Sequence, residues 1–303
     1  MKTVIIGAGA MGCLFGGLLT EGGADVWLLD VWQEHVAVLQ DEGLSIEWQG
    51  KIRRVPVKAT TDPGSIGKLD LAIVFVKSLH TATAADTAAG LLAENGFALT
   101  LQNGMGNADI ISEAVDAERV IAGTTAHGAT LLGPGHIRHA GRAATLIGMW
   151  GNGDPAVAVK TAAFLTAAGI ETEANENIRA IVWNKLLVNI GINAITALTG
   201  IKNGQLLDLP QTRELSTAAV EEAVAVARAL GLEVAQDAAE RTLEIARATA
   251  ANRSSMGQDV DGRRPTEIGA INGFVVRQAE ELNVDVPVNR TLTTLVETIQ
   301  AHF

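Results

Sequence analysis

The spacing of hydrophobic and polar positions changes once along this chain of 303 residues, near residue 176. Before that point, short apolar segments alternate with helical patterns, which is typical of a parallel sheet with helices wound on both faces. After it, the alternation of strands ends and long, alanine-rich helical patterns follow. The pattern therefore predicts an α/β protein with two domains, 1–175 and 176–303.

Each domain contributes its own predicted elements. In the first, strands are expected at 4–6, 25–29, 71–76, 97–101 and 170–174, with a helix at 11–21. A hairpin is expected over 45–57, turning at Gln49-Gly50. Residues 136–139 and 144–149 are predicted to be antiparallel strands added at the edge of the sheet. In the second domain, helices are expected at 178–198, 212–229, 235–250, 265–282 and 288–301.

The six residues GAGAMG directly follow the first strand and open the first helix. Gly7 permits a tight turn, Gly9 allows a pyrophosphate to approach the backbone, and Gly12 allows the helix to pack closely on the sheet. An ordinary glycine-rich turn is the alternative, but the flanking strand and helix favour a dinucleotide site in a Rossmann-type, doubly wound sheet. Its predicted cofactor-binding residues are Gly7, Ala8, Gly9, Ala10, Met11 and Gly12.

Asp30 ends the second predicted strand, 18 residues beyond Gly12. An acidic side chain at this place accepts hydrogen bonds from the ribose hydroxyls of NAD and repels the 2′-phosphate of NADP. No Lys or Arg follows it before Lys51, so the chain lacks a nearby basic residue for that phosphate. Asp30 therefore favours NAD, with capping of a turn as its alternative role.

Composition narrows the choice of partner and compartment. Hydrophobic residues make up 48% of the chain, enough for a large core, and the net charge of −11 disfavours nucleic acid or an anionic membrane as a partner. The single cysteine, Cys13, excludes an intramolecular disulfide and is expected to be a small buried residue. The sequence shows no zinc-ligand spacing, no signal peptide, and no apolar run of the roughly 20 residues that span a membrane. We therefore expect a cytoplasmic protein.

Chemistry is predicted first in the helix at 178–198. Lys185, Asn189 and Asn193 recur every four residues and share one face of an otherwise apolar helix. Buried polar groups are costly unless they are satisfied, so the stripe predicts either hydrogen bonds between domains or a site in which an ammonium group donates a proton beside orienting amides. The dinucleotide motif favours the second reading.

Two more segments carry candidate residues. Ser254 and Ser255 follow a predicted helix, and Glu267 is expected in the first turn of the next one, where capping is the simpler role. Asn103, in QNGMGN, follows a strand at the sheet edge where doubly wound folds bind ligands, although an Asn-Gly turn alone explains it too.

Taken together, these segments resemble the ketopantoate reductase (2-dehydropantoate 2-reductase) family nearly from end to end. The resemblance rests on GAGAMG, the lysine in VFVKS, QNGMGN, GTTAHGA, WNKLLVNIGINAITALTGIKNG and SSMGQDVDGRRPTEIGAINGF. The last two, in this order, are highly specific for the family.

The resemblance implies a role for each matching residue. Lys185 would be the general acid that protonates the alkoxide as hydride reaches the 2-keto carbon, and Glu267 would position Lys185, the substrate hydroxyl and the cofactor. The substrate-binding residues would be Asn189, Asn193, Asn203 and Ser255, with Ser255 at the carboxylate. Lys77, Asn103 and Ala129 would contact the nicotinamide half of the dinucleotide. His127 and His139 are expected to be buried and hydrogen-bonded.

One position departs from the family pattern, because well-known members use NADPH and carry an arginine where this chain has Asp30. The first expectation is NAD(P)H-dependent reduction of ketopantoate to D-pantoate, in pantothenate biosynthesis. An NADH-dependent D-2-hydroxy acid dehydrogenase for other branched or bulky 2-oxo acids is the alternative. A non-catalytic dinucleotide sensor is a third reading, and the family also suggests a homodimer through the helical domain.

Overall fold

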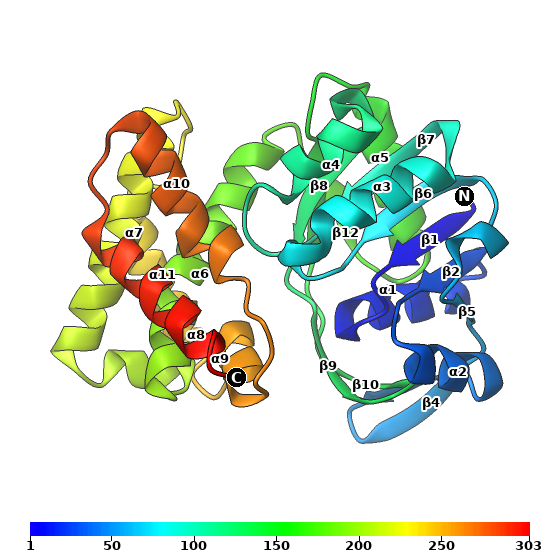
Figure 1. Cartoon of the computed structure of the whole chain (residues 1–303), viewed down its shortest axis with the longest axis horizontal. Helices are drawn as coiled ribbons and strands as arrows, with labels where there is room; N and C mark the ends of the chain where they lie inside the picture. The colour runs from blue at the N-terminus through cyan, green and yellow to red at the C-terminus, as the bar shows by residue number, and fades with distance from the viewer. The chain divides into compact units, whose positions relative to one another are not determined.

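The computed structural model describes residues 1–303, and its contacts divide the chain into two units (Figure 1). The N-terminal unit comprises Met1–Gln102 and Asn107–Ile178. The helical unit comprises Asn103–Gly106 and Arg179–Phe303, so a four-residue turn from the first half of the chain belongs to it.

An eight-stranded sheet forms the centre of the N-terminal unit. Its order is β12-β11-β8-β7-β6-β1-β2-β5, and the six strands from β8 to β5 are parallel. β11 is antiparallel to β8, as predicted for 144–149, and β12 is parallel to β11. The strands are β1 (Thr3–Ile6), β2 (Val26–Leu29), β5 (Lys58–Thr60), β6 (Leu69–Val74), β7 (Leu92–Thr100), β8 (Val120–Thr125), β11 (Thr145–Met149) and β12 (Thr172–Ala174).

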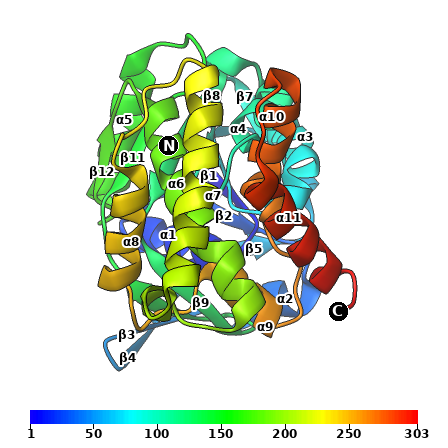
Figure 2. The same ribbon diagram turned by 90° about the vertical axis from the view of Figure 1, so that its left-hand side faces the viewer.

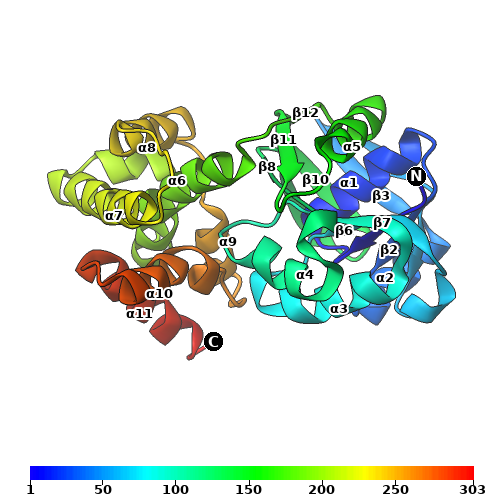
Figure 3. The same ribbon diagram turned by 90° about the horizontal axis from the view of Figure 1, so that it is seen from above.

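Helices cover both faces of this sheet, which confirms the predicted doubly wound fold. Figure 3 shows α1 and α5 on one face and α3 and α4 on the other. Strands buried on both faces read as continuous apolar runs, and Val4, Ile5 and Ile73 are fully buried. The helices are α1 (Ala10–Glu21), α2 (Gln33–Asp41), α3 (Thr81–Leu91), α4 (Asn107–Val115) and α5 (Pro155–Ala167), with 3₁₀ turns η1 (Pro63–Ser65), η2 (Ser78–His80) and η3 (Ala117–Arg119).

A second, four-stranded sheet has the order β4-β3-β10-β9. β3 (Leu44–Trp48) and β4 (Lys51–Val55) form the predicted hairpin, and Gln49 and Gly50 both have positive φ, as the turn of a two-residue hairpin requires. β9 (Gly128–Gly133) and β10 (His136–Gly141) form another hairpin.

The prediction that 136–139 extends the main sheet is therefore wrong. β10 pairs with β3 and β9 instead. This arrangement buries the side chain of Ile137 together with Ile46 and Leu44 in the core that α1 also enters. Burial of these apolar side chains favours the second sheet over an extension of the first.

The helical unit contains six α-helices and no strand (Figure 2). Gly191 lets α6 approach its neighbours, since a Cβ there would lie 2.6 Å from Thr242 on α8 and 2.8 Å from Val220 on α7. The elements are α6 (Ile178–Thr199), α7 (Pro210–Ala229), α8 (Ala238–Ala248), α9 (Ser255–Asp261), α10 (Asn272–Leu282) and α11 (Pro287–Gln300), with 3₁₀ turns η4 (Asn203–Leu207) and η5 (Ile268–Ala270).

Two predictions in this unit need correction. The helix expected over 265–282 begins only at Asn272, because Ile271, with φ −103° and ψ −99°, separates it from η5. Glu267 therefore precedes a 3₁₀ turn rather than lying in the first turn of a helix. The short helix α9 was not predicted, since seven residues are too few for a helical period to be recognised.

The apolar segment that forms α6 is also longer than the sequence pattern suggested. By length and composition alone it could cross a membrane, and 67% of its most apolar window is buried inside the protein. Burial of this kind is what the core helix of a folded unit shows.

Candidate active site

The glycine loop between β1 and α1 can be formed only with glycine at two positions. Gly7 has φ +96°, and a Cβ there would lie 2.7 Å from the backbone nitrogen of Val76. A Cβ on Gly12 would collide with the carbonyl oxygen of Gly7. Close packing of strand, turn and helix therefore explains both glycines, as the motif predicts.

Gly9 differs, because a Cβ built on it would meet no atom within 4 Å. Gly9 is the N-cap of the 12-residue helix α1, and no side chain caps the helix there. The open space therefore lies beside the first backbone N–H groups of the helix. Packing inside the protein thus does not require glycine here, whereas the approach of a phosphate does. The residues of this loop fit a dinucleotide.

Asp30 has structural partners at this loop. Its Oδ2 accepts a hydrogen bond from the backbone N–H of Ala8 at 2.7 Å, and its Oδ1 accepts one from the N–H of Trp32 at 3.0 Å. The turn-capping role therefore exists. It leaves room for ligand binding, since a carboxylate offers about four lone pairs and the backbone uses two.

The strand order places a topological switch point beside the glycine loop. β1 lies between β2 and β6, where connections leave in opposite directions, and ligands of doubly wound sheets bind at the carboxyl ends of such strands. Lys77 is half-buried and follows β6 as the N-cap of η2. Gln102 holds this edge together by donating to the carbonyl of Val76 at 2.8 Å and to the hydroxyl of Thr81 at 2.9 Å.

Ala129 lies on β9, opposite His139 on β10. His127 and His139 are buried, with Nδ1 of the first 3.3 Å from Nε2 of the second, and Nε2 of His139 is 2.9 Å from the carbonyl oxygen of Gly141. Burial lowers the pKa of His127 to about 4 and also lowers the pKa of His139. Both imidazoles are therefore neutral near pH 7, and the expectation that they are buried and hydrogen-bonded is confirmed.

Lys185, Asn189 and Asn193 lie on α6 at intervals of four residues and so share one face of the helix. Burial lowers the pKa of Lys185 to about 8, and the negative charge of Glu267 opposes that shift. The ammonium form is kept at pH 7, but it gives up its proton far more readily than an exposed lysine does. This is the property required of a general acid.

Glu267 is 8% exposed and stands directly before η5. The amide Nδ2 of Asn103 donates a long hydrogen bond of 3.4 Å to its Oε2. The turn Asn103–Gly106 is held there because the N–H of Met105 donates to the carbonyl of Ala270 at 2.8 Å, and Gly104, with φ +84°, leaves no room for a Cβ. The structure thus joins two candidates that are 164 residues apart.

Asn203 opens η4 and is buried. Its Nδ2 donates to the hydroxyl of Thr249 at 3.0 Å, and its backbone N–H donates to the carbonyl of Asn252 at 3.0 Å. Its Oδ1 is buried without a hydrogen-bond partner. An unsatisfied buried acceptor is rare and calls for a donor such as a ligand hydroxyl or water.

The two adjacent serines have separate roles in the structure. Ser254 is the buried N-cap of α9, and its Oγ accepts from the N–H of Gly257 at 3.0 Å and from the hydroxyl of Thr196 at 2.7 Å. Ser255 is the first residue of α9 and is exposed. Capping therefore occupies Ser254, and Ser255 is the serine left accessible to a ligand.

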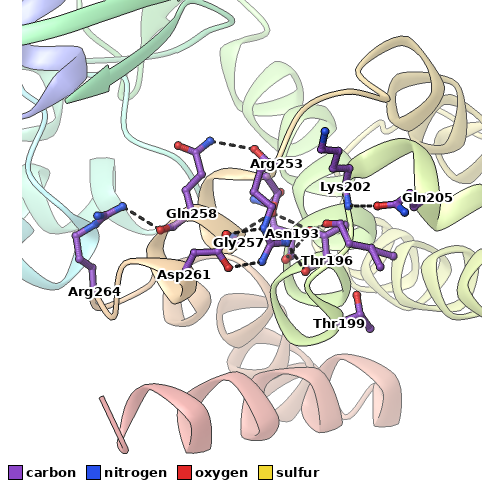
Figure 4. Close-up of polar contacts among 12 residues, drawn as sticks. Asn193, Thr196, Thr199, Lys202, Gln205, Arg253, Gly257, Gln258, Asp261 and Arg264 are labelled. Carbon is purple, nitrogen blue, oxygen red and sulfur yellow. Dashed lines mark hydrogen bonds and ion pairs between the residues drawn. The ribbon is translucent and has the colours of Figure 1, made fainter. Parts of the chain in front are cut away.

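Arg253 was missed by the sequence reasoning, although its spacing of eight residues from Asp261 is visible there. It donates from Nε and Nη2 to the Asp261 carboxylate, at 2.8 Å each, and from Nη1 to the carbonyls of Thr196 and Ile201 (Figure 4). The guanidinium lies against Gly257, where a Cβ would collide with it. Arg253 thereby ties α9, which carries Ser255, to the end of α6.

Two related family models match most of this chain. The model of the family "Ketopantoate reductase PanE/ApbA" matches residues 3–152, and that of its C-terminal part matches residues 177–300. The chain is 40% identical over 301 residues to a 2-dehydropantoate 2-reductase of Halobacterium salinarum, covering 99% of both chains.

Solved structures agree in fold over the whole chain. A ketopantoate reductase of this family from Ralstonia eutropha superposes with a TM-score of 0.91 at 35% identity, covering 100% of this chain and 99% of the other. D-mandelate dehydrogenase, in a ternary structure with NADH and anilino(oxo)acetate, superposes with a TM-score of 0.94 at 28% identity, with the same coverage.

Proposed function

This chain belongs to the ketopantoate reductase family, and on that premise we propose that it reduces ketopantoate to D-pantoate with a reduced nicotinamide dinucleotide. The observation that carries the proposal is Lys185, an ammonium group whose pKa burial lowers to about 8, on one helix face with Asn189 and Asn193. We assign the dinucleotide to the domain 1–175 and the 2-oxo acid to the domain 176–303.

Lys185 is the proposed general acid. A reduced nicotinamide, when bound, supplies the hydride to the keto carbon. As negative charge develops on the keto oxygen, the Nζ ammonium group of Lys185 stabilises it and then donates its proton, so that the product is a 2-hydroxy acid. The carboxylate of Glu267 keeps Lys185 charged, because its negative charge raises the lysine pKa against the effect of burial.

The remaining polar residues are assigned to the substrate and the cofactor. Asn189 and Asn193 orient the 2-oxo acid from the α6 face, and the accessible hydroxyl of Ser255 binds its carboxylate. The unsatisfied Oδ1 of Asn203 accepts a hydrogen bond from a hydroxyl group of the substrate. Lys77, Asn103 and Ala129 are assigned to the nicotinamide half of the cofactor.

NADH is the proposed cofactor in preference to NADPH. The two lone pairs of Asp30 that the backbone leaves unused can accept both ribose hydroxyls, whereas a 2′-phosphate would be repelled by the same carboxylate. The related D-mandelate dehydrogenase was solved with NADH, which supports this choice.

A second candidate is an NADH-dependent D-2-hydroxy acid dehydrogenase that acts on bulky 2-oxo acids. The high structural similarity to D-mandelate dehydrogenase favours it, and its chemistry at Lys185 would be the same. A dinucleotide sensor without catalysis is disfavoured, because sensing gives no reason to keep a half-buried lysine within the electrostatic influence of a buried glutamate. A cytoplasmic location and a homodimer through the helical domain remain predictions.

Initial rates with a panel of 2-oxo acids, each with NADH and with NADPH, test the proposal. We expect the highest kcat/KM with ketopantoate and NADH. A higher value with a bulky 2-oxo acid would favour the second candidate, and no oxidation of either cofactor with any acid would contradict both.

A further inference from the structure

Two apolar side chains are exposed immediately after Asp30. Val31 is 92% exposed and Trp32 is 40% exposed. Neither side chain has a role in the site described above, and covering an exposed aromatic side chain with a ligand is favourable. The exposed part of the indole is available for contact with a ligand.

Trp32 is held rigidly rather than hanging free in solvent. Its backbone N–H donates to Oδ1 of Asp30, and it forms the N-cap of α2. Its indole stacks on the imidazole of His35, with ring centroids 5.1 Å apart and planes inclined by 11°. One face of the indole is therefore covered, and the opposite face is the one available to a ligand.

His35 is itself fixed from two sides. Its Nδ1 accepts a hydrogen bond from the N–H of Gly135 at 3.0 Å, and its Nε2 lies 3.4 Å from Sγ of Cys13. His35 is 1% exposed. The pair of stacked rings is thus anchored both to the second sheet and to α1, so the orientation of the indole is set before any ligand arrives.

The location of this surface identifies the ligand. Asp30 contacts both the glycine loop, through Ala8, and Trp32. In a doubly wound fold the adenosine ribose lies at the acidic residue that ends the second strand, and the adenine ring is attached to that ribose. A flat purine and an indole with one open face are complementary surfaces.

We propose that Trp32 is the adenine platform of this protein: its indole, backed by His35, stacks on the adenine ring of the dinucleotide whose ribose Asp30 binds. This inference rests on the proposed use of a dinucleotide. It adds a binding residue for the adenosine half, and it does not depend on which 2-oxo acid is reduced.

ADP-ribose, which has the adenosine and both phosphates but no nicotinamide, is the probe for this proposal. Its affinity for the full-length protein is measured by calorimetry in wild type, Trp32→Ala and Trp32→Phe. We expect Trp32→Ala to weaken binding about tenfold, the usual effect of losing one base–aromatic stack, and Trp32→Phe to retain most of the affinity. Ile52→Ala, which removes a 64% exposed apolar side chain from β4, is the matched control and should bind normally.

Fluorescence and kinetics give independent readouts. ADP-ribose should quench tryptophan fluorescence in wild type and much less in Trp32→Phe. Trp32→Ala should raise KM for NADH without changing KM for the 2-oxo acid. Equal ADP-ribose affinity in wild type and Trp32→Ala overturns the platform even if the enzyme is active, and so does equal weakening in Ile52→Ala. Tight, Trp32-dependent binding without reductase activity would support the platform while refuting the proposed function. No binding of ADP-ribose to wild type would refute both.

Discussion

Lys185 shows how strongly the surroundings of one residue alter its chemistry. Lysine ordinarily has a pKa of 10.5, and burial lowers the pKa of this one to about 8. Lys185 remains protonated at pH 7, and because its pKa is lower it is a stronger acid than an ordinary lysine. The negative charge of Glu267 limits the shift.

Replacing Lys185 tests its role directly. Lys185→Ala should lower kcat by a factor on the order of 10² to 10⁴, the usual contribution of a general acid, while the Kd for NADH stays nearly unchanged. Steady-state kinetics and calorimetry measure the two quantities. Lys160→Ala, at an exposed position of α5, is the control. A normal kcat in Lys185→Ala would remove the residue from the mechanism.

The pH profile tests the pairing of Lys185 with Glu267. In the direction of reduction, kcat should fall above about pH 8, because the neutral amine of Lys185 has no proton to donate. Glu267→Gln removes the negative charge that raises the lysine pKa, so the fall should move to lower pH. Rates measured from pH 6 to 10 decide this, and a shift to higher pH in Glu267→Gln would refute the assigned interaction.

Asp30 governs the choice of cofactor in this proposal. Asp30→Arg should change the ratio of kcat/KM values for NADH and NADPH by at least about tenfold toward NADPH, since one ionic contact with a phosphate is worth at least 1.4 kcal/mol. Both absolute values should fall, because the N–H groups of Ala8 and Trp32 lose their acceptor. An unchanged ratio would show that Asp30 only supports the loop.

At the scale of elements, α9 depends on contacts that its own sequence does not reveal. Seven residues form a marginal helix in isolation. The helix is stabilised by the Ser254 cap, by the hydrogen bond from Arg253 to the carbonyl of Thr196 on α6, and by the salt bridge between Arg264 and buried Asp259. Its first residue, Ser255, is consequently held in a fixed place at the end of α6.

The adjacent serines form a matched pair for mutation. Ser254→Ala should destabilise the protein by about 1 kcal/mol, because the cap of α9 is lost. Ser255→Ala should leave stability within about 0.5 kcal/mol, as usual for exposed positions, and should raise KM for the 2-oxo acid. Urea denaturation and initial rates separate these effects. Equal stability losses in both variants would contradict the division of roles.

The accuracy of the sequence-based predictions also varied by element. The strands β1 and β2, the hairpin at Gln49-Gly50 and the helix α6 were predicted because their periodicity or turn residues are local. β10 was predicted in the wrong sheet because the backbone of a strand can form the same hydrogen bonds with a strand of either sheet. Its actual partner, β3, lies about 90 residues earlier, and only burial of Ile137 selects it.

At the scale of the whole molecule, a cofactor that binds only the folded state must stabilise it. NADH at about 100 times its Kd should add about 2.7 kcal/mol to the free energy of unfolding. For a protein of 303 residues, that corresponds to a rise in Tm of roughly 4 °C. Scanning calorimetry with NADH and with NADPH measures it, and the smaller shift should belong to NADPH. No shift with either would contradict dinucleotide binding.

The sequence by itself determined the doubly wound sheet, the helical second half, the glycine loop and the lysine–asparagine stripe, because each depends on the local periodicity or conformational freedom of neighbouring residues. The tertiary structure alone decided which of two adjacent serines is accessible, that β10 joins a second sheet, that Asn103 meets Glu267, and that the Lys185 pKa is lowered. These properties depend on burial and on contacts between residues far apart in the chain, and such contacts leave no periodic pattern in the sequence.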